Sequence, residues 1–281
     1  MSASSSPQPS LRVAVIGAGP SGIATGHELL AQGFSEFTIF EKASKPGGTW
    51  HNESYPGLAC DVWAHSYTYS YAPNPDWSAS FAERAEIEAY LQRCAKDFGL
   101  EPHIRCNTCI THAHYQGDGV WQLQSAEGDT FEFDVVINAM GNQHTALYPE
   151  VKGMDSFEGP SWHSTTWDND IDLSDKHIAI VGSAASAVQV VPEVTKMAKQ
   201  VTVLQRTPNW IMPRGRVTYS DSKRKLFNLV PPYLRITQKV QRALMGMIEQ
   251  ASTLGHKRMD QFENRVLGFI KKAIDDPKTQ E

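Results

Sequence analysis

The sequence predicts an α/β fold that contains two dinucleotide-binding (Rossmann-like) βαβ units, parallel sheets, a β-meander and a helical C-terminal segment. Three observations predict it. A glycine-rich turn follows a short apolar run twice, at residues 17–22 and 182–187. Short β-type runs separated by turn residues lie between these turns, at 104–138. From about residue 221 the apolar residues recur at helical spacing, and no strand-like run follows.

The first βαβ unit begins with the apolar run Val13 to Ile16, which is short enough for a buried parallel strand. The motif GAGPSG follows directly and opens a helix. Gly17 permits the tight turn, Gly19 lets a pyrophosphate approach the backbone, and Gly22 lets helix and strand pack closely. The helix N-terminus then faces the phosphates with its partial positive charge.

Glu41 ends the second strand of this unit, 24 positions after Gly17. A carboxylate at this place accepts hydrogen bonds from ribose hydroxyls. An acidic residue favours a free diol over a 2′-phosphate, so FAD or NAD fits and NADP does not. The alternative is an acidic strand end without a ligand.

The second unit reads GSAASA from Gly182 to Ala187, with Ala184 in place of the middle glycine. Its strand ends at Arg206, again 24 positions after the first glycine. Arginine suits a 2′-phosphate through a bidentate, charge-assisted pair, which predicts NADPH. The alternative is an ordinary surface arginine. Opposite charges at the two ribose sites predict two cofactors, a resident flavin and a visiting nicotinamide.

The remaining segments are assigned from periodicity. A helix is predicted over 83–99, and the meander is expected to return into a buried strand, Val135 to Asn138. Cys106 and Cys109 form a C-x-x-C pattern with histidines nearby, which is the alternative of a zinc site. Strand alternation places the two cysteines on opposite faces, so no metal is predicted.

Composition limits the function classes. The chain has 281 residues, 41% of them hydrophobic and 20% charged, as in a soluble globular protein. A net charge of −5 argues against a nucleic-acid partner, although residues 221–281 carry twelve Lys and Arg against seven Asp and Glu. No run of about 18 apolar residues suggests a transmembrane segment. Four unevenly spaced cysteines indicate a reducing, cytoplasmic location.

The stretch FEGPSWHSTTWD lies between the two units and fits the pattern F-x-G-x-x-x-H-x-x-x-W-[PD] through Phe157, Gly159, His163, Trp167 and Asp168. With it the chain resembles the family of type I Baeyer–Villiger monooxygenases. Further matches to that family are GGTW (47–50), YPGLACD (55–61), APNPDWS (72–78) and QRTPNW (205–210).

The resemblance implies that NADPH reduces FAD, O2 adds at flavin C4a, and the peroxyflavin inserts one oxygen into a small-molecule ketone to give an ester or lactone. It implies these FAD contacts: Gly17, Gly19, Ser21, Gly22, Glu41, Gly48, Thr49, Trp50, Asp61 and Tyr67. It implies these NADP contacts: Gly182, Ser183, Ala184, Ser186, Ala187, Arg206 and Thr207. Three residues receive catalytic roles: Asp61 near nicotinamide and flavin, and His163 with Trp167 in a linker that couples domain rotation to catalysis.

The composition of residues 1–10 predicts a short disordered arm. The resemblance implies three further segments: the N-terminal half of the FAD-binding domain at 11–145, the linker and NADP-binding domain at 146–220, and its helical part at 221–281. The second FAD half and an active-site arginine would follow residue 281, so the chain resembles a C-terminally truncated member. Two hypotheses follow. The chain is an enzyme, alone or with a complementing chain or homo-oligomer, or it is a non-catalytic relative that binds a nucleotide or a partner.

Overall fold

The structure is a computed structural model that describes residues 11–143, 145–207, 209–253 and 258–274. The predicted arm at 1–10 lies outside these residues. The chain divides into two compact units, the first made of Met1–Leu58 and Arg84–Ile171, the second of Ala59–Glu83 and Asp172–Glu281. Residues 59–83 therefore belong to the second unit although they interrupt the first in sequence. The four functional segments expected from the sequence stay predictions.

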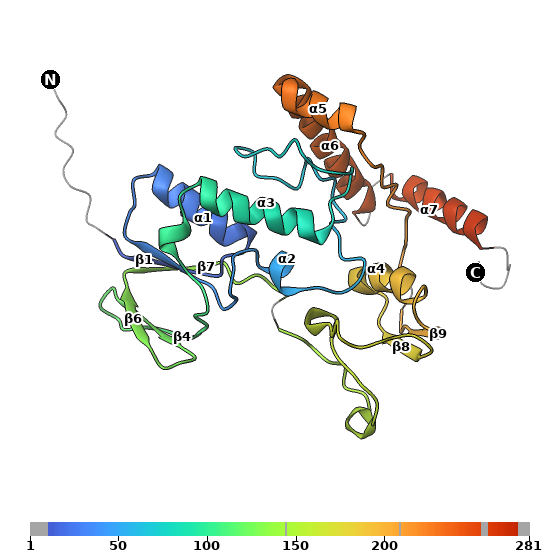
Figure 1. Cartoon of the computed structure of the whole chain (residues 1–281), viewed down its shortest axis with the longest axis horizontal. Coiled ribbons are helices and arrows are strands. Elements are labelled where there is room, and N and C mark those ends of the chain that lie inside the picture. Colours follow the sequence, from blue (N-terminus) through green and yellow to red (C-terminus); the bar gives the residue numbers. More distant parts are fainter. Residues whose placement is uncertain (1–10, 144, 208, 254–257, 275–281) are drawn as a thin grey trace. The chain divides into compact units, whose positions relative to one another are not determined.

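A parallel sheet forms the centre of the first unit (Figure 1). Its strand order is β3 (Ile104–Arg105), β2 (Phe37–Phe40), β1 (Val13–Ile16) and β7 (Val135–Asn138). Val13 of β1 lies opposite Phe37 on one side and Val135 on the other. The central strand β1 is apolar along its whole length and largely buried, as expected for a strand with neighbours on both sides.

Helices cover one face of this sheet. The helix α1 (Pro20–Ala31) packs on β1 and β2, and α3 (Arg84–Asp97) packs on α1. A short helix α2 (Thr49–Asn52) and the 3-10 turn η1 (Glu101–His103) connect the elements. Ile87, Tyr90, Leu91 and Cys94 of α3 are buried, which confirms the helical spacing read from the sequence.

The predicted meander covers the other face. It consists of the antiparallel strands β4 (Ile110–Tyr115), β5 (Trp121–Ser125) and β6 (Thr130–Phe133). Leu123 and Phe133 from the meander form a hydrophobic cluster with Ala14 and Phe40 of the parallel sheet. The first unit thus has three layers: helices, parallel sheet and antiparallel sheet.

The expectation of a buried strand at Val135–Asn138 is wrong in its burial and right in its bounds. Three residues of β7 are half-buried, and Asn138 is exposed. The reason is position, because β7 pairs with β1 alone among the described strands and forms the edge of the sheet. An apolar run predicts a strand, but it does not say whether the strand is central or at an edge.

The second unit contains the second βαβ motif. Strands β8 (His177–Val181) and β9 (Gln200–Leu204) are parallel, and α4 (Ala185–Val194) connects them. Val190 and Val194 of α4 are buried, whereas alternate residues of β8 are exposed.

Residues 59–83 extend the second unit. Ala79 forms an antiparallel bridge with Thr218, the Ser80 N–H donates to the Val217 carbonyl at 2.8 Å, and the Tyr219 N–H donates to the Ser78 carbonyl at 2.8 Å. This segment, which we call the excursion 59–83, is therefore tied by main-chain hydrogen bonds to the chain that leads into the C-terminal helices.

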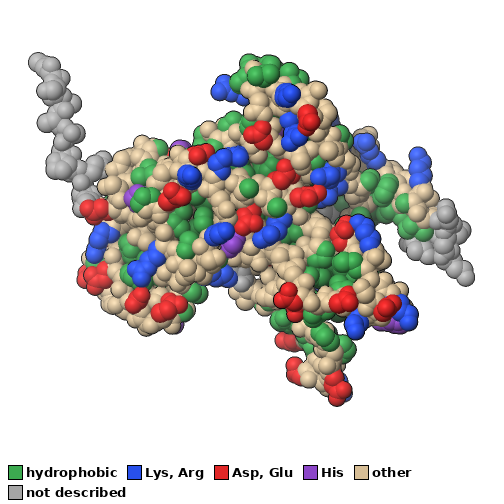
Figure 2. Space-filling model, viewed as in Figure 1, with side chains coloured by type: hydrophobic (Ala, Val, Ile, Leu, Met, Phe, Trp, Pro, Cys, Tyr) green, Lys and Arg blue, Asp and Glu red, His purple; other side chains and the backbone are tan. Residues whose placement is uncertain are grey.

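The C-terminal helices are α5 (Asp221–Leu229), α6 (Pro231–Ser252) and α7 (Met259–Ala273), which confirms the helical pattern beyond residue 221. Phe227, Leu234 and Val266 are buried among them. Figure 2 shows hydrophobic side chains at the surface over α5, together with Lys and Arg side chains. Leu229 is the most exposed of these apolar residues, at 79%.

Candidate nucleotide-binding sites

The first glycine loop leaves no room for side chains at two of its glycines. Gly17 has φ of 104°, and a Cβ there would lie 2.6 Å from the Ala139 carbonyl oxygen. A Cβ on Gly22 would lie 1.8 Å from the Gly17 carbonyl oxygen. Gly19 is different, because its φ is −76° and a Cβ would lie 3.4 Å from the Cα of Gly48. The glycines at the two ends therefore shape the loop, whereas a side chain at Gly19 would make an ordinary contact with the Gly48 backbone.

Glu41 is 4% exposed and holds the first loop in place. Its Oε2 accepts a hydrogen bond from the Ala18 N–H at 2.8 Å, and its Oε1 accepts one from the Ala43 N–H at 2.9 Å. The Ala18 carbonyl accepts from the Gly47 N–H at 3.0 Å. Each carboxylate oxygen has a further lone pair. The same side chain can thus organise the loop and accept from a ribose hydroxyl.

The other predicted flavin contacts in the first unit surround this loop. Ser21 lies exposed in the first turn of α1, which begins at Gly19 without a side-chain cap. Gly48, with φ of 58°, precedes α2, where Thr49 is half-buried and Trp50 is buried. The unit brings together the main-chain N–H groups of α1, the Glu41 carboxylate and the GGTW turn.

The second loop is braced by a residue that the sequence analysis did not select. Asn209 Nδ2 donates to the Ser183 carbonyl at 2.6 Å and to Ser183 Oγ at 3.1 Å. Ser183 Oγ donates to the Thr207 carbonyl at 3.4 Å. Gly182 has φ of 114°, and a Cβ there would meet nothing within 4 Å. Backbone conformation, not crowding, favours glycine at this position.

Arg206 is exposed at the end of β9, and no ion pair or hydrogen bond of its guanidinium occurs among the described residues. The N-cap residue of α4 is Ala184, so this helix also begins without a side-chain cap. Ala184 is exposed, while Ser186 and Ala187 are half-buried in the first turn. The second unit therefore combines an available cation with uncapped helix N–H groups, a donor set that suits phosphates.

Asp61 and Tyr67 lie in the excursion 59–83 and hence in the second unit, not with the other predicted flavin contacts. Asp61 is exposed and Tyr67 is half-buried. Gln189 of α4 bonds to both main-chain groups of Ala59: its Nε2 donates to the Ala59 carbonyl at 2.8 Å, and its Oε1 accepts from the Ala59 N–H at 3.4 Å. Burial raises the pKa of the adjacent Cys60 thiol to about 11.

His163 and Trp167 flank a 3-10 turn, η3 (Ser164–Thr166), in the first unit. His163 Nδ1 accepts from the Thr165 N–H at 3.2 Å, so the proton of a neutral ring lies on Nε2. Trp167 contacts Trp162 edge to face, with ring centroids 5.5 Å apart. His163 thus has a local capping role, and its predicted coupling role stays a prediction.

Gln189 and Asn209 are functional candidates that sequence reasoning missed. Asn209 lies inside the QRTPNW stretch, which was the available signal. Nothing in the residues around Gln189 indicated its contact, because its partner Ala59 is 130 positions away.

Two further features are absent from the described residues, a metal site and a membrane-spanning helix. No group of three or more His, Cys, Asp or Glu side chains there could hold a metal ion. Among the helices of the same described segments, none is both long and apolar enough to cross a membrane.

Comparisons with known proteins place these loops in a family. Residues 10–250 match a family model described as "FMO-like: Flavin-binding monooxygenase-like". A Baeyer-Villiger monooxygenase of Streptomyces coelicolor is 38% identical over 241 residues, which are 85% of this chain and 46% of that protein. A Baeyer-Villiger monooxygenase of Pseudomonas aeruginosa is 35% identical over 272 residues, 95% of this chain and 51% of that protein. The chain spans about half the length of the curated relatives it matches.

Solved structures agree with the sequence relatives. A complex of OTEMO with FAD and NADP superposes with a TM-score of 0.80 at 25% identity, over 97% of this chain and 60% of that chain. A steroid monooxygenase bound to NADP gives 0.79 at 26% identity, over 97% and 59%. The predicted α/β fold with two dinucleotide-binding units is confirmed. Since the family model covers most of the sequence, the chain belongs to the flavin-binding monooxygenase-like family.

Proposed function

We propose that this chain supplies the FAD and NADPH sites of a Baeyer–Villiger type monooxygenase, which inserts one oxygen atom of O2 into a small-molecule ketone to give an ester or lactone. One observation carries the proposal. The second strand of each unit is followed by an opposite charge: a buried Glu41 carboxylate in the first unit, and in the second an exposed Arg206 guanidinium that has no ion pair among the described residues. The relatives named Baeyer-Villiger monooxygenase and the FAD- and NADP-bound neighbours support the choice of cofactors.

The first unit fits a flavin dinucleotide. A pyrophosphate would bind beside Gly19, which has no side chain to hinder it. The pyrophosphate would accept hydrogen bonds from the uncapped N–H groups of α1. Glu41 would accept from the adenosine ribose, and Thr49 with Trp50 would border the flavin end. Because the Ala18 N–H already binds Glu41, the loop is organised before a ligand arrives.

The second unit fits NADPH. Arg206 would bind the 2′-phosphate, and Ser183, Ser186 and Thr207 would line the path from ribose to pyrophosphate. The Asn209 side chain keeps Ser183 beside Thr207 and so fixes the loop opening. The Ala184 methyl is the one departure in this loop, since it narrows the passage where a glycine would leave it open.

The chemistry divides between cofactor and protein. Bound FAD, reduced by NADPH, would supply the activation of O2, one atom of which goes to the ketone and the other to water. The protein would bind and orient one nucleotide in each of its two units. Asp61, exposed in the excursion 59–83, would orient the nicotinamide, while His163 and Trp167 would transmit the relative motion of the two units.

A cytoplasmic location is part of this proposal. All four cysteines are free thiols, and two of them, Cys60 and Cys94, are buried. Burial raises the pKa of both buried thiols, which keeps them protonated and unreactive.

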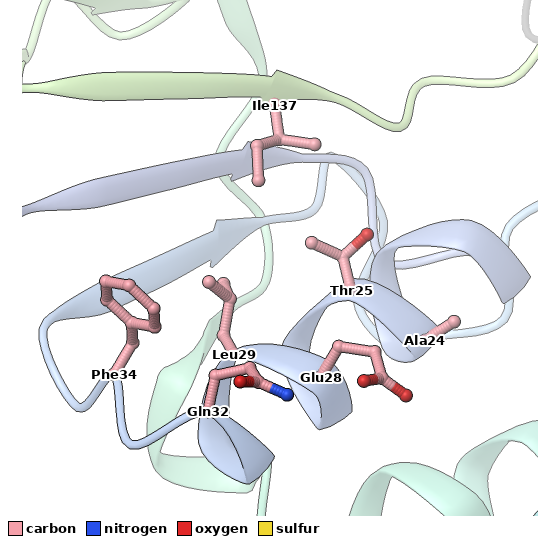
Figure 3. A pocket seen from close by; sticks show the side chains of 7 residues that line it. All are labelled: Ala24, Thr25, Glu28, Leu29, Gln32, Phe34 and Ile137. Atoms are coloured by element: carbon pink, nitrogen blue, oxygen red, sulfur yellow. The ribbon is translucent and has the colours of Figure 1, made fainter.

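A second candidate function is that of a non-catalytic relative that binds a nucleotide or a polypeptide partner. An open apolar groove of about 390 Å³ in the first unit favours it (Figure 3). Ala24, Thr25, Glu28, Leu29, Gln32, Phe34 and Ile137 line the groove. It runs between α1 and the edge strand β7, where a complementing chain or a second copy could add a strand and a helix.

The visible spectrum of the purified chain, before and after anaerobic addition of NADPH, tests the proposed function. Flavin absorbance that bleaches with NADPH, followed by ketone-stimulated O2 uptake, supports the monooxygenase. Bleaching with O2 uptake that no ketone stimulates, and with release of H2O2 alone, supports cofactor binding without oxygen transfer. A colourless protein that does not take up added FAD favours the second candidate.

A further inference from the structure

One glutamine side chain holds the segment that carries Asp61. We infer that Gln189 is a positioning residue, which fixes Asp61 relative to the second glycine loop and thereby sets where the nicotinamide end of NADP is received. The inference rests on the proposed function for its ligand. Its structural part rests on the two hydrogen bonds between the Gln189 amide and the main chain of Ala59, at 2.8 and 3.4 Å.

The contact satisfies both polar groups of one buried residue. Ala59 is 5% exposed, so water does not replace a lost partner easily. On the other side of the segment, the Cys60 N–H donates to the Ala82 carbonyl at 2.9 Å, and Ala59 forms an antiparallel bridge with Glu83. The Gln189 amide therefore takes the place of a second neighbouring strand. Without it, a buried N–H and a buried carbonyl would be left unpaired.

Asp61 is anchored closely on its N-terminal side. Only Cys60 separates it from Ala59, and the Cys60 side chain is 3% exposed. The Cys60 Sγ also accepts from the Val62 N–H at 3.4 Å. The main chain on both sides of Asp61 is therefore fixed, while the Asp61 side chain itself is exposed. Such an arrangement presents a carboxylate at a defined place.

The anchor belongs to the helix that begins at the nucleotide loop. Gln189 follows Ala185, the first residue of α4, by four positions, so both lie on one face of the helix. Ser186 and Ala187, two of the predicted NADP contacts, lie between them. A rigid helix thus links the predicted pyrophosphate end to the Ala59 contact. Displacing the Gln189 amide would move Asp61 without touching the residues that bind the adenosine end.

The first experiment tests, without any nucleotide, whether the hydrogen bonds between Gln189 and Ala59 hold residues 59–62. Gln189→Met removes the amide at nearly constant side-chain length, and Gln189→Glu keeps the acceptor for the Ala59 N–H but loses the donor to its carbonyl. Gln200→Met, an exposed glutamine at the start of β9, is the matched control. Amide hydrogen exchange across residues 59–62 should be about tenfold faster in Gln189→Met, as expected for the loss of paired main-chain groups. It should rise less in Gln189→Glu and stay unchanged in Gln200→Met.

The second experiment separates positioning from damage to the helix. Calorimetric titrations compare NADP⁺ with 2′,5′-ADP, which carries the 2′-phosphate but no nicotinamide. In Gln189→Met the Kd of NADP⁺ should rise about fivefold, because the receiving segment is less ordered. The Kd of 2′,5′-ADP should stay within about twofold of wild type, because its contacts lie at Arg206.

The outcomes are distinct. Unchanged exchange at 59–62 in Gln189→Met overturns the anchor, and equal weakening of NADP⁺ and 2′,5′-ADP overturns the positioning role. If wild type binds neither nucleotide, the proposed function fails, while the exchange experiment still decides whether Gln189 holds the segment. If Gln189→Met does not fold, Gln189→Glu takes its place in both experiments, with intermediate exchange expected and wild-type exchange counting against the anchor.

Discussion

Arg206 is the residue that we propose to determine the preference for NADPH over NADH. Its guanidinium is exposed at the end of β9 and forms no ion pair within the described segments. An arginine that is not engaged with the protein can give both of its N–H pairs to a phosphate. The 2′-phosphate is the only group that distinguishes the two nucleotides, so a single side chain can set the preference.

Arg206→Ala is expected to weaken NADPH about 30-fold, because hydrogen bonds to a charged group contribute about 2 kcal/mol. NADH should be affected less than about twofold, since it lacks the phosphate. Dissociation constants for both nucleotides measure the effect. Lys199→Ala, an exposed cation at the opposite end of the second unit's strand pair, is the control and should change neither. Equal losses of both nucleotides would show that Arg206 does not contact the 2′-phosphate.

His65 is expected to make the stability of the second unit depend on pH. Its ring is fully buried against Tyr219 and Phe227, and neither ring nitrogen has a hydrogen-bond partner in the described part of the chain. Burial lowers the pKa of His65 to about 4, and an interaction with the Asn74 main chain offsets this only in part. The charge of Lys223 lowers it further. The folded second unit therefore resists protonation at this ring.

The free energy of unfolding should consequently fall as the pH drops. Above pH 6.5 the ring is neutral in both states, whereas between 6.5 and 4 the unfolded chain binds a proton that the folded chain does not. The His65 contribution to this loss is about 2 kcal/mol between pH 7 and pH 5. Urea unfolding at the two pH values, monitored by tryptophan fluorescence, measures this loss of stability.

His65→Phe should remove this part of the pH dependence, and the exposed His112→Gln should leave it intact. If the free energy of unfolding of His65→Phe fell with pH as steeply as that of wild type, His65 would not be the group responsible.

At the scale of the element, two glycines of the first loop differ in the reason for which a glycine is needed. Gly22 is required by packing, since a Cβ would lie 1.8 Å from a carbonyl oxygen. Gly19 is not, because its φ of −76° suits any residue and a Cβ would make an ordinary contact at 3.4 Å. The strand–helix junction therefore requires Gly22, whereas the proposed role of Gly19 is toward the ligand.

Gly22→Ala is therefore expected to destabilise the first unit by roughly 3 kcal/mol, through displacement of β1 from α1. Gly19→Ala should unfold at nearly the wild-type temperature and yet lose most of its FAD, because a side chain at the middle glycine of this motif hinders the close approach of a pyrophosphate to the backbone. Thermal unfolding and the flavin content of the purified proteins measure the two effects. Full flavin content in Gly19→Ala would place the dinucleotide elsewhere.

The elements predicted from sequence were those whose signals are local. The two βαβ units, the helix of residues 84–97 and the meander depend on apolar periodicity and glycine spacing within a few tens of residues. The sequence did not reveal that the excursion 59–83 joins the second unit, because its contacts are with Gln189 and with residues 217–219, more than 100 positions away. The edge position of β7 was missed for a related reason, since burial depends on neighbours that no local pattern specifies.

At the scale of the whole molecule, the first unit presents a sheet edge and an apolar groove among its described residues. The edge strand β7 has backbone groups without a strand partner in the described segments, and the groove beside it is lined mainly by apolar side chains (Figure 3). Parallel sheets usually have such edges and faces covered. The relatives, of which the chain spans about half, contain further sequence that could cover them. Self-association would provide the same cover by other means.

The chain by itself is accordingly expected to self-associate through the groove between α1 and β7. Ile137 points from β7 toward Thr25 and Leu29 of α1, at the centre of the apolar lining (Figure 3). Ile137→Lys places a charge there that a second copy cannot bury without a large desolvation penalty. Sedimentation velocity at several concentrations should show oligomers for wild type and monomers for Ile137→Lys.

Val151→Lys, which replaces an exposed apolar residue outside the groove, should associate like wild type. Circular dichroism of Ile137→Lys must match wild type for the comparison to hold, since Ile137 is half-buried. A wild-type chain that remains monomeric at high concentration would show that the groove is compatible with solvent. In that case the open edge of β7 would not promote association. An active enzyme would then not require a partner chain at this groove.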